Sequence, residues 1–138
     1  MPIILDSSVF INSSGFSFLE REEYFMTSLC VGEIKEKTAK LRLDAAWNNY
    51  SFSIQDPCPA SIQKVRELME KHGDSRLSSA DESVVALAIE KREQNEKVWV
   101  YTDDFSIQNL LKWEKIPFSG ILQGTISRKK SFKKTNST

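Results

Sequence analysis

Two short apolar runs that stop abruptly at aspartate residues constrain the fold of this chain more than any other feature. Residues 3–5 read Ile-Ile-Leu and end at Asp6, and residues 98–102 read Val-Trp-Val-Tyr-Thr and end at Asp103 and Asp104. Short apolar and β-branched runs are typical of strands that are buried on both faces of a parallel sheet. We therefore expect two buried strands, each followed at once by a carboxylate.

The rest of the chain alternates between strand patterns and helix patterns. We expect further strands at residues 24–27 and 52–54, and helices at residues 7–11, 29–40, 61–71, 79–89 and 105–113. Residues 43–50 are ambiguous. Strands that alternate with helices at these lengths form right-handed βαβ units. The sequence predicts an α/β fold over residues 1–126, a three-layer sandwich with a mostly parallel central sheet flanked by helices.

Two of these helices carry more specific expectations. The segment 29–40 is expected to form one helix in which Val31, Ile34 and Leu41 share one face. Ser79 is expected to cap the helix that follows it, because Glu82 three residues later completes a capping box.

The composition indicates a single domain of ordinary size. The 138 residues are enough to bury a core without disulfide or metal cross-links. No apolar run approaches the ~20 residues of a membrane helix, and the first residues lack the basic segment of a signal peptide. Cys30 and Cys58 form no CxxC pair, so we expect two buried small side chains and neither a disulfide nor a zinc site. These features predict a soluble, cytoplasmic protein.

The net charge of zero hides an asymmetry between the body of the chain and its end. Residues 128–138 contain five basic residues and no acid, which leaves 14 basic and 19 acidic residues, a formal charge of −5, over residues 1–127. An acidic body does not attract nucleic acid through its surface charge, so its carboxylates suggest another purpose, such as metal binding. Residues 127–138 are expected to be a disordered tail. Its basic residues are Arg128, Lys129, Lys130, Lys133 and Lys134.

The positions of the acids predict a metal site. Asp6, Asp103 and Asp104 follow strands, and the carboxyl ends of parallel strands form the edge at which ligands bind. Asp81, in the first turn of its helix, can point toward the same edge. At ~5 Å and an effective dielectric of about 20, each pair of carboxylates costs on the order of 3 kcal/mol, so a cation or a shared proton is needed. Oxygen ligands without histidine or cysteine favour Mg²⁺ or Mn²⁺, which suit phosphodiester hydrolysis.

Each acid also has a purely structural interpretation. Asp81 could complement the dipole of its helix, and Asp103 or Asp104 could cap the last helix. Glu33 alone is indistinguishable from a solvated helix face. The lone histidine, His72, is expected to end a helix, and the three tryptophans are expected in the core or at an interface.

Four ordered segments resemble the motifs of PIN domains. Residues 3–11 resemble the opening strand, aspartate and Thr/Ser-Ser pair of the family, and residues 29–34 contain an acid at the place of the second motif. Residues 77–88 resemble the third motif and residues 102–109 the fourth. Each motif is weak alone, but their order, spacing and strand context agree over roughly residues 2–125.

The resemblance implies a metal-dependent endoribonuclease that uses Mg²⁺ or Mn²⁺ and leaves 5′-phosphate and 3′-hydroxyl ends. Ser8 matches the position that hydrogen-bonds and orients the first aspartate. Asp103 is a companion ligand at the fourth motif. The catalytic acids that the resemblance implies are Asp6, Glu33, Asp81 and Asp104, and the metal ligands are Asp6, Asp81, Asp103 and Asp104.

Within the family, the wording of two motifs resembles the archaeal NOB-type endonucleases that mature the 3′ end of small-subunit ribosomal RNA. Those proteins continue into a zinc ribbon, whereas no paired cysteines follow Ile126 here. A stand-alone paralogue, a ribbon supplied by another chain and a truncated chain all remain open. Two further interpretations are a toxin of the VapC type, silenced by an antitoxin peptide, and a PIN-like scaffold that binds RNA or protein without cutting it. The retained acids speak against the scaffold, because it would have no use for their repulsion.

RNA is the partner that the resemblance implies, in particular a precursor of ribosomal RNA. A homodimer, and either a pre-ribosomal partner or an antitoxin, also follow from it. An acidic pocket repels RNA until metal is bound, so the phosphate contacts must come from elsewhere. The basic tail is the candidate for these contacts, and the alternative is a solubilising end.

Overall fold

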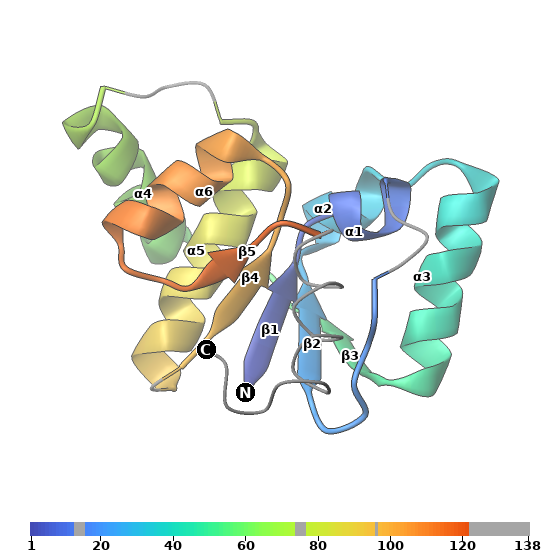
Figure 1. Cartoon of the computed structure of the whole chain (residues 1–138). Coiled ribbons are helices and arrows are strands. Elements are labelled where there is room, and N and C mark those ends of the chain that lie inside the picture. The colour runs from blue at the N-terminus through green and yellow to red at the C-terminus, as the bar shows by residue number, and fades with distance from the viewer. Residues whose placement is uncertain (13–15, 74–76, 96, 122–138) are drawn as a thin grey trace.

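A computed structural model of the chain describes residues 1–12, 16–73, 77–95 and 97–121 (Figure 1). Five strands and six helices alternate along this part of the chain. The strands are β1 (Pro2–Leu5), β2 (Glu23–Met26), β3 (Ser51–Ile54), β4 (Trp99–Tyr101) and β5 (Phe118–Ser119). The helices are α1 (Ser8–Ile11), α2 (Ser28–Gly32), α3 (Lys37–Asn49), α4 (Pro59–Lys71), α5 (Ser79–Gln94) and α6 (Phe105–Trp113).

The strands form one sheet in the order β3-β2-β1-β4-β5, and every neighbouring pair is parallel. β1 is the central strand of this sheet, and all four of its residues are buried, as the uninterrupted apolar run predicts. The chain moves from β1 outward to β3 and then crosses back to place β4 on the other side of β1. The order of the strands therefore reverses between β1 and β4, and such a switch point opens a crevice at the carboxyl edge of the sheet.

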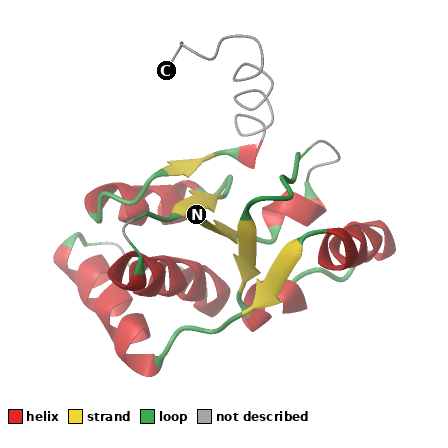
Figure 2. Cartoon of the chain, turned by 90° about the horizontal axis from the view of Figure 1, so that it is seen from below, coloured by secondary structure: helices red, strands yellow, loops and turns green. Residues whose placement is uncertain are grey.

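Helices lie on both sides of this sheet, which confirms the predicted α/β sandwich. Figure 1 shows α3 on one side and α4, α5 and α6 on the other, with α1 and α2 at the upper end of the strands, and Figure 2 shows the strands between these helices. The central helix is α5, in which ten residues are buried, so it has no broad solvated face. No helix in the described part of the chain is long and apolar enough to cross a membrane.

The prediction of one helix over residues 29–40 is wrong. The chain forms the short helix α2, which ends at Gly32, and then begins α3 at Lys37. Glycine is a poor helix former and favours termination at this point. The core face of α3 is set by Ala39 and Ala46, two turns apart, so Leu41 is 59% exposed instead of buried. Of the ambiguous residues 43–50, residues 43–49 form the second half of α3 and Tyr50 is its C-cap.

Two smaller predictions are also corrected. The N-cap of α5 is Ser78 rather than Ser79, because the Ser78 hydroxyl accepts a hydrogen bond from the Asp81 amide at 3.1 Å. The Glu82 side chain forms an ion pair with Arg66 of α4 at 3.4 Å instead of closing a capping box. Of the two cysteines, both free, Cys30 is buried as expected whereas Cys58 is exposed at the start of α4.

Candidate metal centre

Asp6 occupies the switch point of the sheet. Its backbone amide donates to the Tyr101 carbonyl at 3.1 Å, which carries the pairing of β1 and β4 one residue beyond β1. This hydrogen bond holds Asp6 between the ends of the two strands, where the residue is only 5% exposed. The sequence accounts for this position, because Asp6 is the first polar residue after the apolar run that forms β1.

Three residues, Ser7, Ser8 and Thr102, donate hydrogen bonds to the Asp6 carboxylate. Oδ1 accepts from the Ser7 amide at 2.8 Å, and Oδ2 accepts from the hydroxyls of Ser8 at 3.1 Å and Thr102 at 2.9 Å. Burial raises the pKa of Asp6 above its ordinary value, while these hydrogen bonds pull it down and the charge of Glu33 raises it further. The donors thus offset part of the cost of keeping a carboxylate ionised in a buried place.

Glu33 approaches Asp6 from the end of α2. It occupies the C-cap position of that helix, and its Oε1 accepts from the Ser7 hydroxyl at 2.8 Å. One ligand atom each of Asp6, Cys30 and Glu33 lies within 4.8 Å of the others. Burial raises the pKa of the Cys30 thiol to about 12, so this thiol is neutral and the oxygens are the charged ligands.

Asp104 comes from the carboxyl end of β4 and begins α6. Its Oδ1 accepts from the amides of Ser106 at 2.8 Å and Ile107 at 3.1 Å, which is the helix cap that one of the structural interpretations anticipated. A carboxylate has two oxygens, so capping the helix leaves Oδ2 of Asp104 for another ligand. Thr102 connects this residue to Asp6, because its hydroxyl donates to Asp6 and accepts from the Asp104 amide at 3.0 Å.

Asp81 lies in the first turn of α5. Partial burial raises the pKa of Asp81, and the charges of Asp104 and Asp6 add to the increase, while hydrogen bonding to Ser78 opposes it. The charges of Asp104 and Asp6 thus act on Asp81. Among the described residues, however, the ligand atoms found within 4.8 Å of one another are those of Asp6, Cys30 and Glu33, so Asp81 and Asp104 lie outside that tight group. We call Asp6, Glu33, Asp81 and Asp104 the acidic centre.

No basic side chain neutralises the acidic centre within the described ranges. The ion pairs found there join other acids, and none includes a member of the centre. Carboxylates gathered without a cation repel one another. The set of charged oxygen donors therefore fits a hard divalent ion, which would remove this repulsion.

Comparison with known proteins decides the family. The family described as the PIN domain of ribonuclease matches residues 3–90, more than half of the chain. The chain belongs to the PIN-domain ribonuclease family. Membership confirms the nuclease that the four motifs implied, and divalent metal ions are the usual cofactors of PIN nucleases.

Individual relatives agree with this assignment. Over 127 residues the chain is 35% identical to Endoribonuclease Nob1 of Methanothermobacter thermautotrophicus, and the match covers 91% of this chain and 72% of that protein. Proteins of the same name from Archaeoglobus fulgidus and Methanocaldococcus jannaschii are 35% and 34% identical, and the matches span about half of the length of each. Ribonuclease VapC1 of Thermoplasma acidophilum is 30% identical over 93% of this chain and 60% of its own length.

A solved structure shows the same fold at low sequence identity. The crystal structure of VapBC2 from Rickettsia felis, bound to a DNA fragment from its promoter, contains a chain that matches with a TM-score of 0.61 at 10% identity. The match covers 87% of this chain and 98% of that one. The PIN fold is therefore shown by structure as well as by sequence.

The PIN motifs located the acids but not all of the residues around them. Thr102 is fully buried and makes two hydrogen bonds inside the centre, and Ser7 connects Asp6 to Glu33, yet the sequence assigned no role to either. The signal was a hydroxyl residue beside each strand-terminal aspartate. The role of Ser8 in orienting Asp6 stays a prediction, for which the 3.1 Å hydrogen bond gives a geometry.

Other residues singled out in the sequence have partners outside the acidic centre or lie outside the described residues. Oδ1 of Asp103 accepts from the Ile121 amide at 2.8 Å, so this carboxylate ties the chain after β5 to the end of β4. His72 is at the C-cap of α4 and stacks on Trp113, as its expected place at a helix end suggests. The basic residues 128–138 lie outside the described residues.

Proposed function

We propose that this PIN domain is an endoribonuclease that hydrolyses phosphodiester bonds in the precursor of small-subunit ribosomal RNA, with Mg²⁺ or Mn²⁺ bound at the acidic centre. The observation that carries the proposal is a set of acids from four separate elements at the carboxyl edge of the sheet. Ser7 connects Asp6 to Glu33 and Thr102 connects Asp6 to Asp104, and no basic residue in the described part of the chain pairs with any of the four acids. The ribosomal substrate is taken from the Nob1 relatives.

The residues of the chain divide the work as follows. Asp6, Asp81 and Asp104 would hold the metal, with Glu33 at the edge of the shell. A bound Mg²⁺ or Mn²⁺ supplies a Lewis acid that activates water and offsets the charge on the phosphate. Thr102 and Ser8 keep the Asp6 carboxylate in one orientation, because each donates to Oδ2.

Ser7 and the α6 cap position the remaining acids. The Ser7 hydroxyl holds Glu33 against the Asp6 side of the centre. The two amides of α6 fix one oxygen of Asp104, which limits the directions in which its other oxygen can point. Oδ1 of Asp103 accepts from the Ile121 amide, so we propose that Asp103 supports the chain after β5 through this oxygen, while its Oδ2 stays open to the metal.

A cleavage assay with one isosteric substitution tests this proposal. In Mn²⁺, the wild-type chain should cut an RNA that spans the 3′ end of its own small-subunit precursor. Asp6→Asn should reduce the rate at least about 10³-fold, as removal of a central catalytic group does. Asp44→Asn, on the exposed side of α3, is the matched control and should retain full activity.

The outcomes separate the candidate functions. Equal activity of wild type and Asp6→Asn would place the chemistry elsewhere, and an inactive wild type would favour the non-catalytic scaffold. Cleavage of the precursor at one site, in preference to an unrelated structured RNA, is expected for the ribosomal function, which we place in the cytoplasm.

A VapC-type toxin is the second candidate, because Ribonuclease VapC1 is 30% identical over most of the chain. A toxin would arrest growth when expressed alone, cut an RNA other than the precursor, and lose activity when a small antitoxin partner binds. Growth arrest that depends on Asp6 would favour the toxin over the ribosomal enzyme. A homodimer or a pre-ribosomal partner remains compatible with the first candidate.

A further inference from the structure

The outward face of α6 exposes two aromatic side chains that the fold leaves unburied. Phe105 at its first position is 79% exposed, the largest exposed fraction among the described large hydrophobic residues, and Trp113 at its last position is 41% exposed. Asn109 and Lys112 are exposed between them. Residues four, seven and eight positions apart share one side of a helix. We call Phe105, Asn109, Lys112 and Trp113 the α6 stripe.

The opposite face of α6 explains why this stripe points outward. Ile107, Leu110 and Leu111 are fully buried against the rest of the domain. Their burial fixes the rotation of the helix about its axis. The exposure of Phe105 is therefore a consequence of how α6 packs, and folding does not use its aromatic ring.

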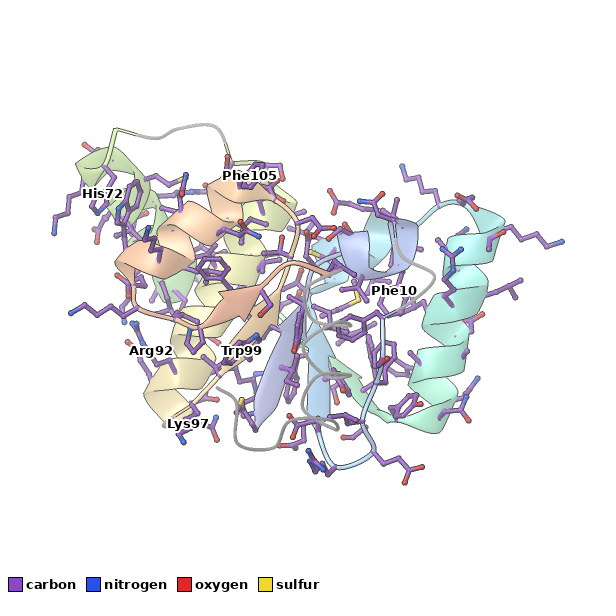
Figure 3. All side chains as sticks on the ribbon, in the orientation of Figure 1. Phe10, His72, Arg92, Lys97, Trp99 and Phe105 are labelled. Carbon is purple, nitrogen blue, oxygen red and sulfur yellow. The ribbon has the colours of Figure 1, made fainter. Side chains whose placement is uncertain are left out.

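The α6 stripe begins at the acidic centre. Phe105 directly follows Asp104, whose side chain caps the helix. The Gln108 side-chain amide donates to the Thr102 carbonyl at 2.8 Å, which ties the first turn of α6 to the end of β4. Figure 3 shows Phe105 at the upper end of α6, on the edge where β1 and β4 end.

The far end of the stripe carries a second aromatic platform and positive charge. The ring of His72 stacks on Trp113 at a centroid distance of 3.7 Å and an interplanar angle of 11°. Arg92 neutralises Glu114, the acid next to Trp113, at 2.6 Å. Within the part of the chain that the structure describes, Lys112 forms no ion pair with any carboxylate.

We propose that the α6 stripe binds a single-stranded segment of the RNA substrate beside the acidic centre, an inference that rests on the proposed function. A base stacks on Phe105, Lys112 contacts a phosphate, and a second base stacks on the Trp113 end. Proteins bind single-stranded nucleic acid through aromatic side chains interleaved with cations. Each base offers a ring face for stacking, and each nucleotide carries a phosphate that a cation can contact. Paired bases in a duplex are not available for such stacking.

The length of the stripe fits a few nucleotides. Eight residues separate Phe105 from Trp113, which is roughly 12 Å along a helix that rises 1.5 Å per residue. At the ~3.4 Å spacing of stacked nucleotides, this distance corresponds to three or four of them. The stripe would thereby supply phosphate and base contacts that the acidic centre, which repels RNA, cannot make.

Leucine substitutions distinguish base stacking from ordinary apolar contact. Leucine keeps the apolar bulk of Phe105 but removes the ring, whereas tyrosine keeps the ring. We would titrate fluorescent single-stranded RNA against the wild-type protein, and against its Phe105→Leu and Phe105→Tyr variants, with Ca²⁺ in place of Mn²⁺ to fill the oxygen-ligand site. Gel analysis of the RNA afterwards would confirm that it is uncut. Leu41→Ala, which changes an exposed apolar residue of α3, is the control.

We expect Phe105→Leu to weaken RNA binding about tenfold, within the range for loss of one stacking residue, and Phe105→Tyr to retain it. Lys112→Gln should lower the slope of log affinity against log salt by about 0.7, the value for one lost phosphate contact on a single strand. Lys40→Gln on α3 should leave that slope unchanged. The melting temperature should stay the same in all of these variants, because each side chain is exposed.

The inference is overturned if Phe105→Leu binds RNA as tightly as its parent, or if neither binds RNA. If Phe105→Leu binds RNA as tightly as its parent and Phe105→Tyr binds it more weakly, Phe105 makes an apolar contact, as in a protein interface, and no base stacks on it. Cleavage by the same proteins in Mn²⁺, measured in parallel, tests the proposed function separately. Weaker binding by Phe105→Leu together with an uncleaved RNA would support the stripe and contradict the nuclease.

Discussion

Two neighbouring acids at the start of α5 have opposite surroundings. Glu82 is buried and forms an ion pair with Arg66 of α4 at 3.4 Å. Asp81, one residue earlier, faces the charges of Asp104 and Asp6, and the pKa of Asp81 is raised by burial and by those charges. The domain thus provides a cation for Glu82 but only further negative charge for Asp81. This difference indicates that the acids near Asp81 bind a cation that the protein itself does not supply.

The same contrast extends to the surfaces around these residues. On the side of α4, α5 and α6, acids pair with basic residues, as Glu93 does with Lys64 at 2.8 Å and Glu114 with Arg92 at 2.6 Å. At the carboxyl edge of the sheet, hydroxyl groups take the place of basic residues as the partners of Asp6 and Glu33. Hydroxyls orient a carboxylate without neutralising it, so the charge remains available to a metal ion.

Replacing Asp81 and Glu82, one at a time, by the corresponding amide should give the largest difference between the two acids. Asp81→Asn should reduce cleavage by about 10²-fold or more, as loss of a metal ligand does, while the metal-free protein keeps or gains stability because a repelling charge is gone. Glu82→Gln should leave cleavage intact and cost roughly 1 kcal/mol of unfolding free energy, since Arg66 is largely exposed. Cleavage rates and urea unfolding of the two variants measure both effects. Loss of activity in Glu82→Gln with none in Asp81→Asn would reverse the assignment.

Removing one hydroxyl from the acidic centre should have a smaller effect. Thr102→Val keeps the shape of the side chain but deletes the donor to Asp6 and the acceptor of the Asp104 amide. We expect cleavage to fall about 10- to 100-fold, as for other residues that orient metal ligands, and stability to fall by about 1–3 kcal/mol because a partly buried amide loses its partner. Thr102→Ser should restore most of both. An active Thr102→Val variant would show that Asp6 needs no orientation from β4.

The pH dependence of the metal-free protein should change least. Burial holds the pKa of Asp6 above its ordinary value of 3.8, so the folded protein keeps a proton there that the unfolded chain releases. The resulting stabilisation is complete below about 3.8 and is lost as the pH rises through the higher pKa of the folded state. In chelator, the stability of wild type relative to Asp6→Asn should therefore increase on acidification toward about pH 4. A difference that is constant over this range would show that Asp6 ionises normally without metal.

The sequence predicts those parts of the fold and of the acidic centre that depend on local pattern. An apolar run that ends at Asp6 fixes a central strand and the place of one carboxylate, and the Thr102-Asp103-Asp104 string does the same for β4. Topology then brings the strand ends together. For this reason the α/β class and the edge that carries the acids follow from spacing alone.

Residues whose partners come from other elements were beyond such patterns. Ser79 fits the local capping-box pattern, but the Ser78 hydroxyl makes the cap by accepting from the Asp81 amide. Glu82 fits a capping box locally but finds Arg66 across the helix pair. α2 ends at Gly32, and Ala39 and Ala46 set the buried face of α3, so the larger Leu41 was a misleading guide to the core face.

Mn²⁺ binding by the acidic centre is the most direct test of the central claim. Calorimetric titration of the wild-type protein should show saturable binding of Mn²⁺. In thermal unfolding the melting temperature should rise with the Mn²⁺ concentration, because Mn²⁺ at a hundred times its dissociation constant adds about 2.7 kcal/mol to the free energy of unfolding. Asp44→Asn should behave as wild type, and Asp6→Asn should lose both responses. Equal Mn²⁺ binding by wild type and Asp6→Asn, or no binding by either, would contradict the account.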